Sequence, residues 1–319
     1  MILHNLVPYS EKKLDCYQNM LVTILANEGC DLNLLGAMLP WRYYRRGVSG
    51  EIANCYIASD STVEEVYGYE VRRQIFQLGS IVENLIDALS NGPVIVNVDQ
   101  FYIPHHYVHI YQKQHGQHSL LITGYNKQKN IFYCVDAFPQ YTGEISCGVL
   151  ETAIKNFPFE YVKMEYSTVA QIERVVKSTD EILKGFVKSS RAYREYEDKG
   201  VFSNRAILEL FDEIATLSDL CFYEELNSVC SGTWIWEMDR TVHWTISYIN
   251  TEYVRKVYGD ENIKLLEKLL LQCNAICVGA YRLIYKSLVS KSRKNFWQGH
   301  DKLKEAILVQ NEICKLIDA

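Results

Sequence analysis

The sequence contains no long apolar run. None of its apolar stretches reaches the ~18 residues that a membrane-spanning helix needs, so no membrane segment is predicted. The start of the chain also lacks the basic residues and the following apolar stretch of a secretory leader. We therefore predict a cytoplasmic protein whose ten cysteines remain reduced thiols and do not form a disulfide framework.

An excess of positive charge is also lacking. The formal net charge of −6 argues against nucleic acid as a partner, because that role needs a strongly basic surface. No pair of Cys-x-x-Cys motifs is present, so no structural zinc site is expected. A glycine-rich phosphate loop is absent as well, so the sequence predicts no nucleotide cofactor.

The 319 residues favour two domains of different class. Three β-branched, apolar runs predict strands at 93–99, 119–125 and 131–136, the last two as a hairpin around a polar turn at 126–130. A helix is predicted at 81–89, and later helices are predicted at 169–196, 205–226, 262–286 and 301–317. Cys273 and Cys277 are expected in the core. The chain thus divides into an α+β catalytic domain, 1–166, and a mainly helical domain, 167–319.

Cys16 opens an amphipathic run, which places it at the N-terminus of a helix. The unpaired N–H groups and the dipole at such an end favour the thiolate, the nucleophilic form of cysteine. The alternative is a small buried apolar residue, the usual role of a free cysteine.

Five of the eight histidines fall between residues 105 and 118. A metal site is one interpretation, but most of these histidines lie in an irregular loop, so no metal is predicted. His118 differs, because it stands at the start of a predicted strand. Asp136 ends the strand predicted to pair with it, so the two side chains should lie side by side.

Cys16, His118 and Asp136 supply a nucleophile, a base and a group that orients the base. The sequence alone does not bring Cys16 to His118, and three unrelated polar residues remain the alternative.

Three stretches carry a resemblance: Gly-Pro-Val-Ile-Val-Asn-Val-Asp from residue 92, Gln-His-Ser-Leu-Leu-Ile-Thr-Gly-Tyr from residue 117, and Phe-Tyr-Cys-Val-Asp-Ala-Phe-Pro from residue 132. With the cysteine and its helix, they resemble the N-terminal domain of the butirosin biosynthesis protein H family, which is papain-like and related to C39 peptidases. The chain is also similar to amide synthetases of the closthioamide type. The resemblance implies a papain-like cysteine protease fold, with Cys16, His118 and Asp136 as the catalytic triad.

The segment before Cys16 departs from the papain-like pattern. Papain-like enzymes usually carry a glutamine there as an oxyanion donor, but residues 10–15 contain none. The Cys16 backbone N–H would then need another donor, and the candidates are Gln18, Asn19 and Asn97.

The resemblance implies an ATP-independent acyltransferase of antibiotic biosynthesis, which moves an acyl group from a carrier-protein thioester through acyl-Cys16 to a small-molecule amine. No cofactor is expected beyond the carrier's own phosphopantetheine. Carrier proteins are acidic, so five arginines are candidates for docking an acyl or peptidyl carrier protein: Arg42, Arg45, Arg46, Arg72 and Arg73. Three aromatic residues are candidates for the substrate pocket, to which the helical domain is expected to contribute: Tyr102, Trp234 and Trp236.

Two other functions remain open. A cysteine protease or thioesterase would use the same triad with water as the acceptor, and a non-catalytic binding module would keep the fold without needing the thiolate. The sequence leaves the oligomeric state open, a homo-oligomer included.

Overall fold

The computed structural model describes residues 2–11, 14–37, 43–46, 51–54, 60–77, 79–157, 164–172, 177–195, 204–230 and 234–319. The chain forms two compact units, each made from two stretches of sequence. The sheet unit comprises Met1–Leu32 and Ala58–Val176, and the helical unit comprises Asn33–Ile57 and Lys177–Ala319. The fold is α+β, as predicted. The predicted division at residue 166 stays a prediction, and residues 33–57 group with the helical unit.

The sheet unit is built on an antiparallel sheet in the order β4-β9-β5-β6-β7-β8, with β1 beside β6. The three predicted strands are confirmed as β5 (Val94–Asp99), β6 (Gln117–Asn126) and β7 (Ile131–Ala137), and β6 pairs with β7 as the predicted hairpin. The other strands are β1 (Ile2–Leu3), β4 (Tyr69–Ile75), β8 (Gln140–Ser146) and β9 (Glu165–Gln171).

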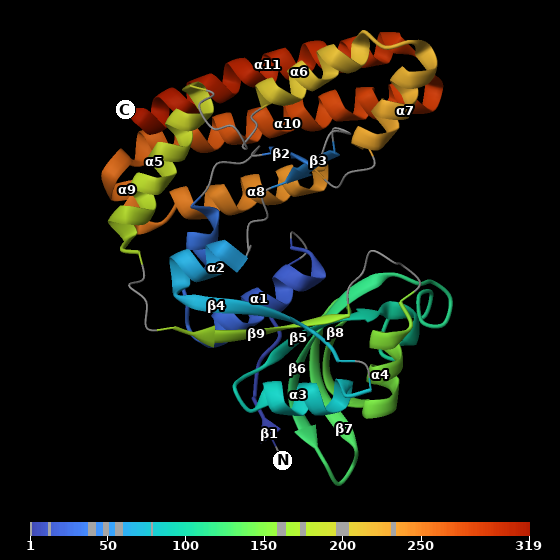
Figure 1. Cartoon of the computed structure of the whole chain (residues 1–319). Coiled ribbons are helices and arrows are strands. Elements are labelled where there is room, and N and C mark those ends of the chain that lie inside the picture. Colours follow the sequence, from blue (N-terminus) through green and yellow to red (C-terminus); the bar gives the residue numbers. More distant parts are fainter. Residues whose placement is uncertain are drawn as a thin grey trace. The chain divides into compact units, whose positions relative to one another are not determined.

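In the described part of the sheet unit, four α-helices accompany the sheet: α1 (Cys16–Asn27), α2 (Asp60–Tyr67), α3 (Ile81–Leu89) and α4 (Cys147–Lys155). Alternate residues of β5 and β6 build a core with α3 and α4, which lie beside the sheet in Figure 1: Val94, Val96, Val98, Leu120 and Ile122. The residues between them point to the opposite face because side chains alternate along a strand. Asn97 and Ser119 belong to this second face, and α1 packs there, since Cys16 at its start contacts Ser119.

The helical unit contains η1 (Leu32–Gly36), β2 (Tyr43–Arg46), β3 (Glu51–Asn54), α5 (Thr179–Glu195), α6 (Asn204–Ala215), α7 (Asp219–Cys230), α8 (Trp234–Ile249), α9 (Glu252–Tyr258), α10 (Asp260–Ser290) and α11 (Arg293–Asp318). The predicted helix 169–196 begins later than expected because Val169 belongs to β9. The predicted helix 205–226 is two helices, α6 and α7.

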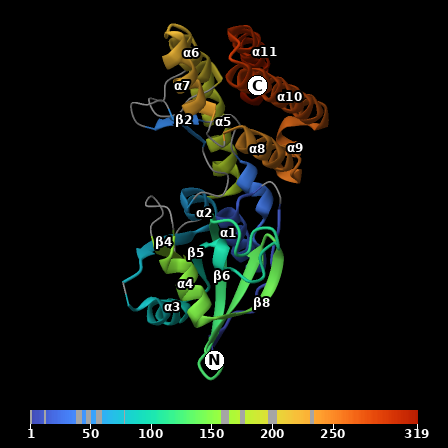
Figure 2. The ribbon, with the colours of Figure 1, turned by 90° about the vertical axis from the view of Figure 1, so that its right-hand side faces the viewer.

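The long helices α10 and α11 lie side by side in both views (Figure 1, Figure 2). Buried residues of α10 recur three and four apart, which produces one continuous apolar seam: Ile263, Leu266, Leu270, Cys273, Cys277, Ala280 and Ile284. The prediction that Cys273 and Cys277 are core residues is confirmed. At Gly299 of α11 a Cβ would lie only 2.6 Å from Ile284 Cγ1, so the helices approach too closely there for a side chain.

Candidate active site

Cys16 is the first residue of α1, as predicted. Asp15 caps the helix, because its carboxylate accepts from the Gln18 backbone N–H at 2.7 Å. The Gln18 side-chain oxygen in turn accepts from the Asp15 backbone N–H at 2.9 Å. Such reciprocal caps fix where a helix begins, and a good N-cap is worth about 1 kcal/mol. The local sequence therefore places the Cys16 side chain and backbone N–H at the open end of the helix.

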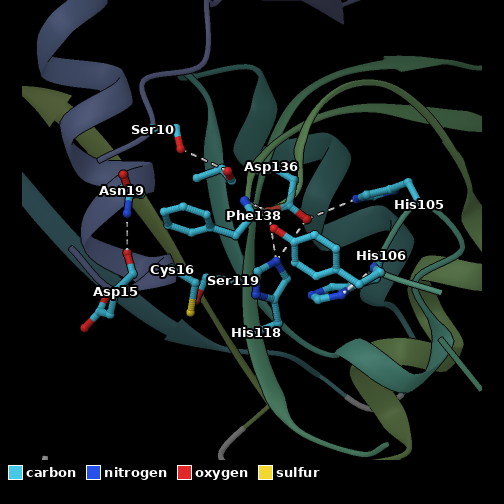
Figure 3. Close-up of polar contacts among 12 residues, drawn as sticks. Ser10, Asp15, Cys16, Asn19, His105, His106, His118, Ser119, Asp136 and Phe138 are labelled. Atoms are coloured by element: carbon cyan, nitrogen blue, oxygen red, sulfur yellow. Dashed lines mark hydrogen bonds and ion pairs between the residues drawn. The ribbon is translucent and has the colours of Figure 1, made fainter. Parts of the chain in front are cut away.

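Asn19 fixes the segment that leads into Cys16 (Figure 3). Its side-chain amide, fully buried, donates to the backbone carbonyls of Glu11, Leu14 and Asp15 at 2.9–3.1 Å. Its side-chain oxygen accepts from the Glu11 N–H at 2.9 Å. These contacts give Asn19 a structural task and leave it no N–H for a substrate oxyanion.

His118 and Asp136 lie in contact, as predicted for the facing ends of β6 and β7. His118 Nε2 lies 2.9 Å from each Asp136 carboxylate oxygen, and both side chains are buried. Burial disfavours the imidazolium, but hydrogen bonds with Asp136 and Cys16 outweigh it and raise the pKa of His118 from 6.5 to about 10. Because Nε2 faces Asp136, Nδ1 is the ring nitrogen left for Cys16. The structure thus brings the three predicted triad residues together (Figure 3).

The Asp136 carboxylate has two further donors. His105 Nε2 lies 3.1 Å from Oδ2, and the Phe138 backbone N–H donates to Oδ1 at 3.0 Å. Burial alone would raise the pKa of Asp136, but the hydrogen bonds from His105, His118 and Phe138 hold it below its usual value. Asp136 is therefore an anion between two imidazole rings, with the His105 ring stacked on Tyr141 at 3.9 Å between centroids.

His106 packs edge-on against His118, with ring centroids 4.9 Å apart and planes at 81°. Burial, and then the charge of His118, lower the pKa of His106 from 6.5 to about 4, so this ring is neutral at neutral pH. Its Nδ1 accepts from the Tyr107 N–H at 2.9 Å, which leaves the proton on Nε2. The sequence placed His105 and His106 in an irregular loop, and nothing in their spacing singles them out as neighbours of the triad.

A second carboxylate, Asp99 at the end of β5, is also fully buried. It accepts from His115 Nδ1 at 2.6 Å and from the backbone N–H groups of Phe101 and Gly116 at 3.1 Å. His115 is 41% exposed and stacks on Phe101. Residues 100–116 are called the histidine segment below. Asp99 holds both of its ends, through Phe101, His115 and Gly116, and Asp136 holds it at His105. The described residues contain no group of three or more His, Cys, Asp or Glu side chains arranged to hold a metal.

The other two oxyanion candidates, Gln18 and Asn97, have different environments. The Gln18 side-chain nitrogen is buried and has no hydrogen-bond partner in the part of the chain that the structure describes. Asn97 lies opposite Ser119 in the pairing of β5 with β6, and its oxygen accepts from the Ser119 hydroxyl at 3.1 Å. Ser119, which the sequence interpretation missed, accepts from the Cys16 thiol at 3.7 Å.

Arg72 and Arg73 project from β4 and are at least half exposed, each already paired with a carboxylate. Arg72 binds Glu70, whereas Arg73 binds Asp60 at 2.8 Å and lies over the Tyr17 ring. Tyr102 is half-buried in the short helix η2 (Gln100–Tyr102) and packs against the sheet core.

The remaining sequence candidates belong to the helical unit. Arg42 lies outside the described residues, and so do the side chains of Arg45, Arg46, Trp234 and Trp236, of which only the backbone in β2 and α8 is described.

Residues 34–169 match the model of the Peptidase_C39 like family. The matched range contains His118 and Asp136 and begins after Cys16. No curated protein matches the chain. The match supports a relationship to C39 peptidases and a cysteine-protease-like fold, which is compatible with acyl transfer as well as with proteolysis. In the described parts of the chain no helix is long and apolar enough to cross a membrane.

Proposed function

We propose that this protein is an acyltransferase that forms amides from carrier-protein thioesters through an acyl-Cys16 intermediate, without ATP. The observation that carries the proposal is the contact of Cys16 with His118 and of His118 with Asp136. The proposal includes a papain-like fold for the sheet unit, a place in antibiotic assembly as in the butirosin protein H and closthioamide-type enzymes, and a cytoplasmic location.

In the first step, the Cys16 thiolate attacks the thioester carbonyl and forms a tetrahedral oxyanion. The bond from this carbon to the pantetheine sulfur then breaks, and the leaving sulfur takes the proton from His118 Nδ1. An imidazolium is ready for this task because Asp136 and Cys16 raise the pKa of His118 to about 10. The products are acyl-Cys16, a neutral His118 and the free carrier thiol.

In the second step, an amine attacks the acyl-Cys16 carbonyl. Neutral His118 takes a proton from the amine nitrogen, and the carbon–sulfur bond breaks to give the amide and the Cys16 thiolate. Asp136 stabilises the imidazolium that forms again and keeps the ring oriented through Nε2. The thioester already holds the energy for amide formation, so no nucleotide takes part.

The oxyanion needs donors in both steps. Cys16 begins α1, so its N–H has no intrahelical carbonyl to bond and is one donor. Gln18 is our choice for the second, because its buried side-chain nitrogen has no partner among the described residues. Removing an oxyanion donor typically weakens transition-state binding by ~2.7–4 kcal/mol.

We propose an acyl or peptidyl carrier protein as the acyl donor and a small-molecule amine as the acceptor. The acidic surface of the carrier would approach arginines from the predicted docking set. In the sheet unit, Arg72 and Arg73 would exchange their intramolecular carboxylates for those of the carrier. The phosphopantetheine arrives as part of this substrate.

Acyl-pantetheine thioesters test the proposal when they are incubated with the protein with and without primary amines. We expect intact-protein mass spectrometry to show one acyl group, absent in Cys16→Ala, and we expect amide products when amine is present. A lack of acylation by every thioester, or acylation that persists in Cys16→Ala, would contradict a covalent mechanism at Cys16.

A peptidase or thioesterase is the second candidate, because the matched family model is a peptidase-like one. It would use Cys16, His118 and Asp136 with water in place of the amine. Hydrolysis at a rate that added amine leaves unchanged, with no amide formed, would favour this candidate over the transferase.

A further inference from the structure

A buried hydroxyl that the proposed mechanism does not use lies beside the Cys16 sulfur. Ser119, directly after His118 in β6, is 1% exposed. The Cys16 thiol donates to its oxygen at 3.7 Å, and the Ser119 hydroxyl donates in turn to the Asn97 side-chain oxygen at 3.1 Å. Ser119 therefore lies between the Cys16 sulfur and the Asn97 side-chain oxygen, and its hydroxyl can donate one hydrogen bond.

The protonation of the sulfur decides where that hydrogen goes. When the sulfur is a thiol, it donates to the Ser119 oxygen, and the Ser119 hydroxyl donates to Asn97 Oδ1, as in the structure. A thiolate has no hydrogen to donate and is itself an acceptor, and a hydroxyl rotates readily about its C–O bond. A hydrogen bond to the charged form of a group favours that form.

We propose that Ser119 is a further catalytic residue, whose hydroxyl alternates between Asn97 Oδ1 and the Cys16 sulfur and so favours the thiolate before each attack. Once the sulfur carries the acyl group it is a weak acceptor, and the Ser119 hydroxyl again donates its hydrogen bond to Asn97 Oδ1. The proposal rests on Cys16 being the nucleophile of the proposed function.

Asn97 is then a positioning residue that competes with the sulfur for one hydrogen. It lies directly opposite Ser119 in the pairing of β5 with β6, so strand register holds the competitor in place. Removing the hydroxyl and removing its competitor must therefore shift the reactivity of Cys16 in opposite directions. A residue that only fills space would not produce this pair of signs.

Several titratable groups adjoin Cys16 in the sequence or contact its direct neighbours, and they are unchanged in the variants below. They come from α1, α2, β4, β6, β7 and the histidine segment: Asp15, Tyr17, Asp60, Arg73, His118, Asp136, His105 and His106. Differences between variants thus report on the hydroxyl.

The experiment measures the alkylation of Cys16 by iodoacetamide across pH, with the modified peptide identified by mass spectrometry. The sulfur displaces iodide, so the rate follows the thiolate. We expect Ser119→Ala to move the pH midpoint upward by about 0.5–1 unit, because one hydrogen bond to the thiolate is lost. Asn97→Leu should move it downward, since the hydroxyl loses its other acceptor. The double variant should behave like Ser119→Ala, because Asn97 acts only through the hydroxyl.

Circular dichroism confirms which variants are folded, and either single variant suffices to decide. An unchanged midpoint in a folded Ser119→Ala, or an upward shift in a folded Asn97→Leu, would overturn the role of Ser119 and leave the nucleophile intact. If Cys16 of the unsubstituted protein is not alkylated at any pH, both this role and the proposed function are overturned.

Discussion

The two carboxylates that fasten the histidine segment make the same kind of contact in two different settings. Asp99 and Asp136 are both fully buried, and each bonds a histidine and a backbone N–H. Yet His115 on Asp99 is 41% exposed and has Phe101 as its stacking partner, whereas His118 on Asp136 is buried against Cys16. In the proposed function the pair at Asp136 serves catalysis because the second ring nitrogen of His118 meets Cys16. The pair at Asp99 holds the histidine segment.

The largest expected effect comes from removing the two histidines in turn. His118→Ala should lower kcat/KM for the acyl thioester by about 10²–10⁴-fold, because His118 contacts Cys16 and moves the proton in both proposed steps. His115→Ala, the matched control at the other carboxylate, should change it by less than about threefold. Steady-state kinetics on both variants test this difference. Equal losses of kcat/KM would show that the two aspartate–histidine pairs do not differ in role.

The carboxylates themselves should separate activity from stability. Asp136→Asn should lower kcat by about 10²-fold or more, because the ring of His118 loses the partner that orients it. Asp99→Asn should instead lower the free energy of unfolding by about 1–3 kcal/mol, because a charged acceptor of three hydrogen bonds is lost. Urea denaturation and steady-state kinetics on each variant check whether Asp136→Asn mainly loses activity and Asp99→Asn mainly loses stability. If Asp99→Asn abolishes activity while its stability is unchanged, the two carboxylates are not distinct in role.

A smaller effect is expected from the second histidine on Asp136. His105→Ala removes one hydrogen bond that holds the pKa of Asp136 low, so that pKa should rise. The acid limb of the activity profile should then move to higher pH, with kcat at neutral pH lowered by about three- to tenfold. The pH profile distinguishes this from general damage, which would lower activity without moving the limb.

The last expected effect concerns stability rather than activity, through its dependence on pH. The pKa of His118 is raised on folding, so the stability this ring contributes is full below its unfolded value of 6.5 and is lost as pH rises toward about 10. Asp136 has a lowered pKa, so its contribution is present above its ordinary value of 3.8 and is lost as pH falls through the lower folded value. The difference in unfolding free energy between the unsubstituted protein and His118→Asn should therefore be larger at pH 6 than at pH 10.

Urea titrations at the two pH values measure that difference. His115→Asn is the control, because its ring is partly exposed and contacts Asp99 rather than Asp136. A difference for His118→Asn that does not change between pH 6 and pH 10 would contradict the raised pKa.

Local chemistry made part of this site predictable. The amphipathic run that Cys16 opens predicted the start of α1, and β-branched runs predicted β5, β6 and β7 because such residues favour buried strands. The edge strands β4 and β8 were missed because a strand with one open edge tolerates polar residues, as Arg72 and Glu144 illustrate.

The long-range features of the site could not be predicted in the same way. The hairpin turn fixes His118 against Asp136, but no local rule joins Cys16 to His118 or His105 to Asp136. The strong pattern of β6 also drew attention to His118 and away from Ser119, whose role depends on the neighbouring strand. The grouping of residues 33–57 with the helical unit likewise depends on tertiary packing alone.

The histidine segment is also a practical handle for labelling. It is fastened at Asp99 and Asp136, yet the side chain of Val108 at its outer turn is 84% exposed. A fluorescent amino acid incorporated at residue 108 would sit two residues from His106 without replacing either anchor. The same contacts that hold the imidazoles in place would let such a probe report in real time on substrate arrival at the proposed site, with Cys16, His118 and Asp136 unmodified.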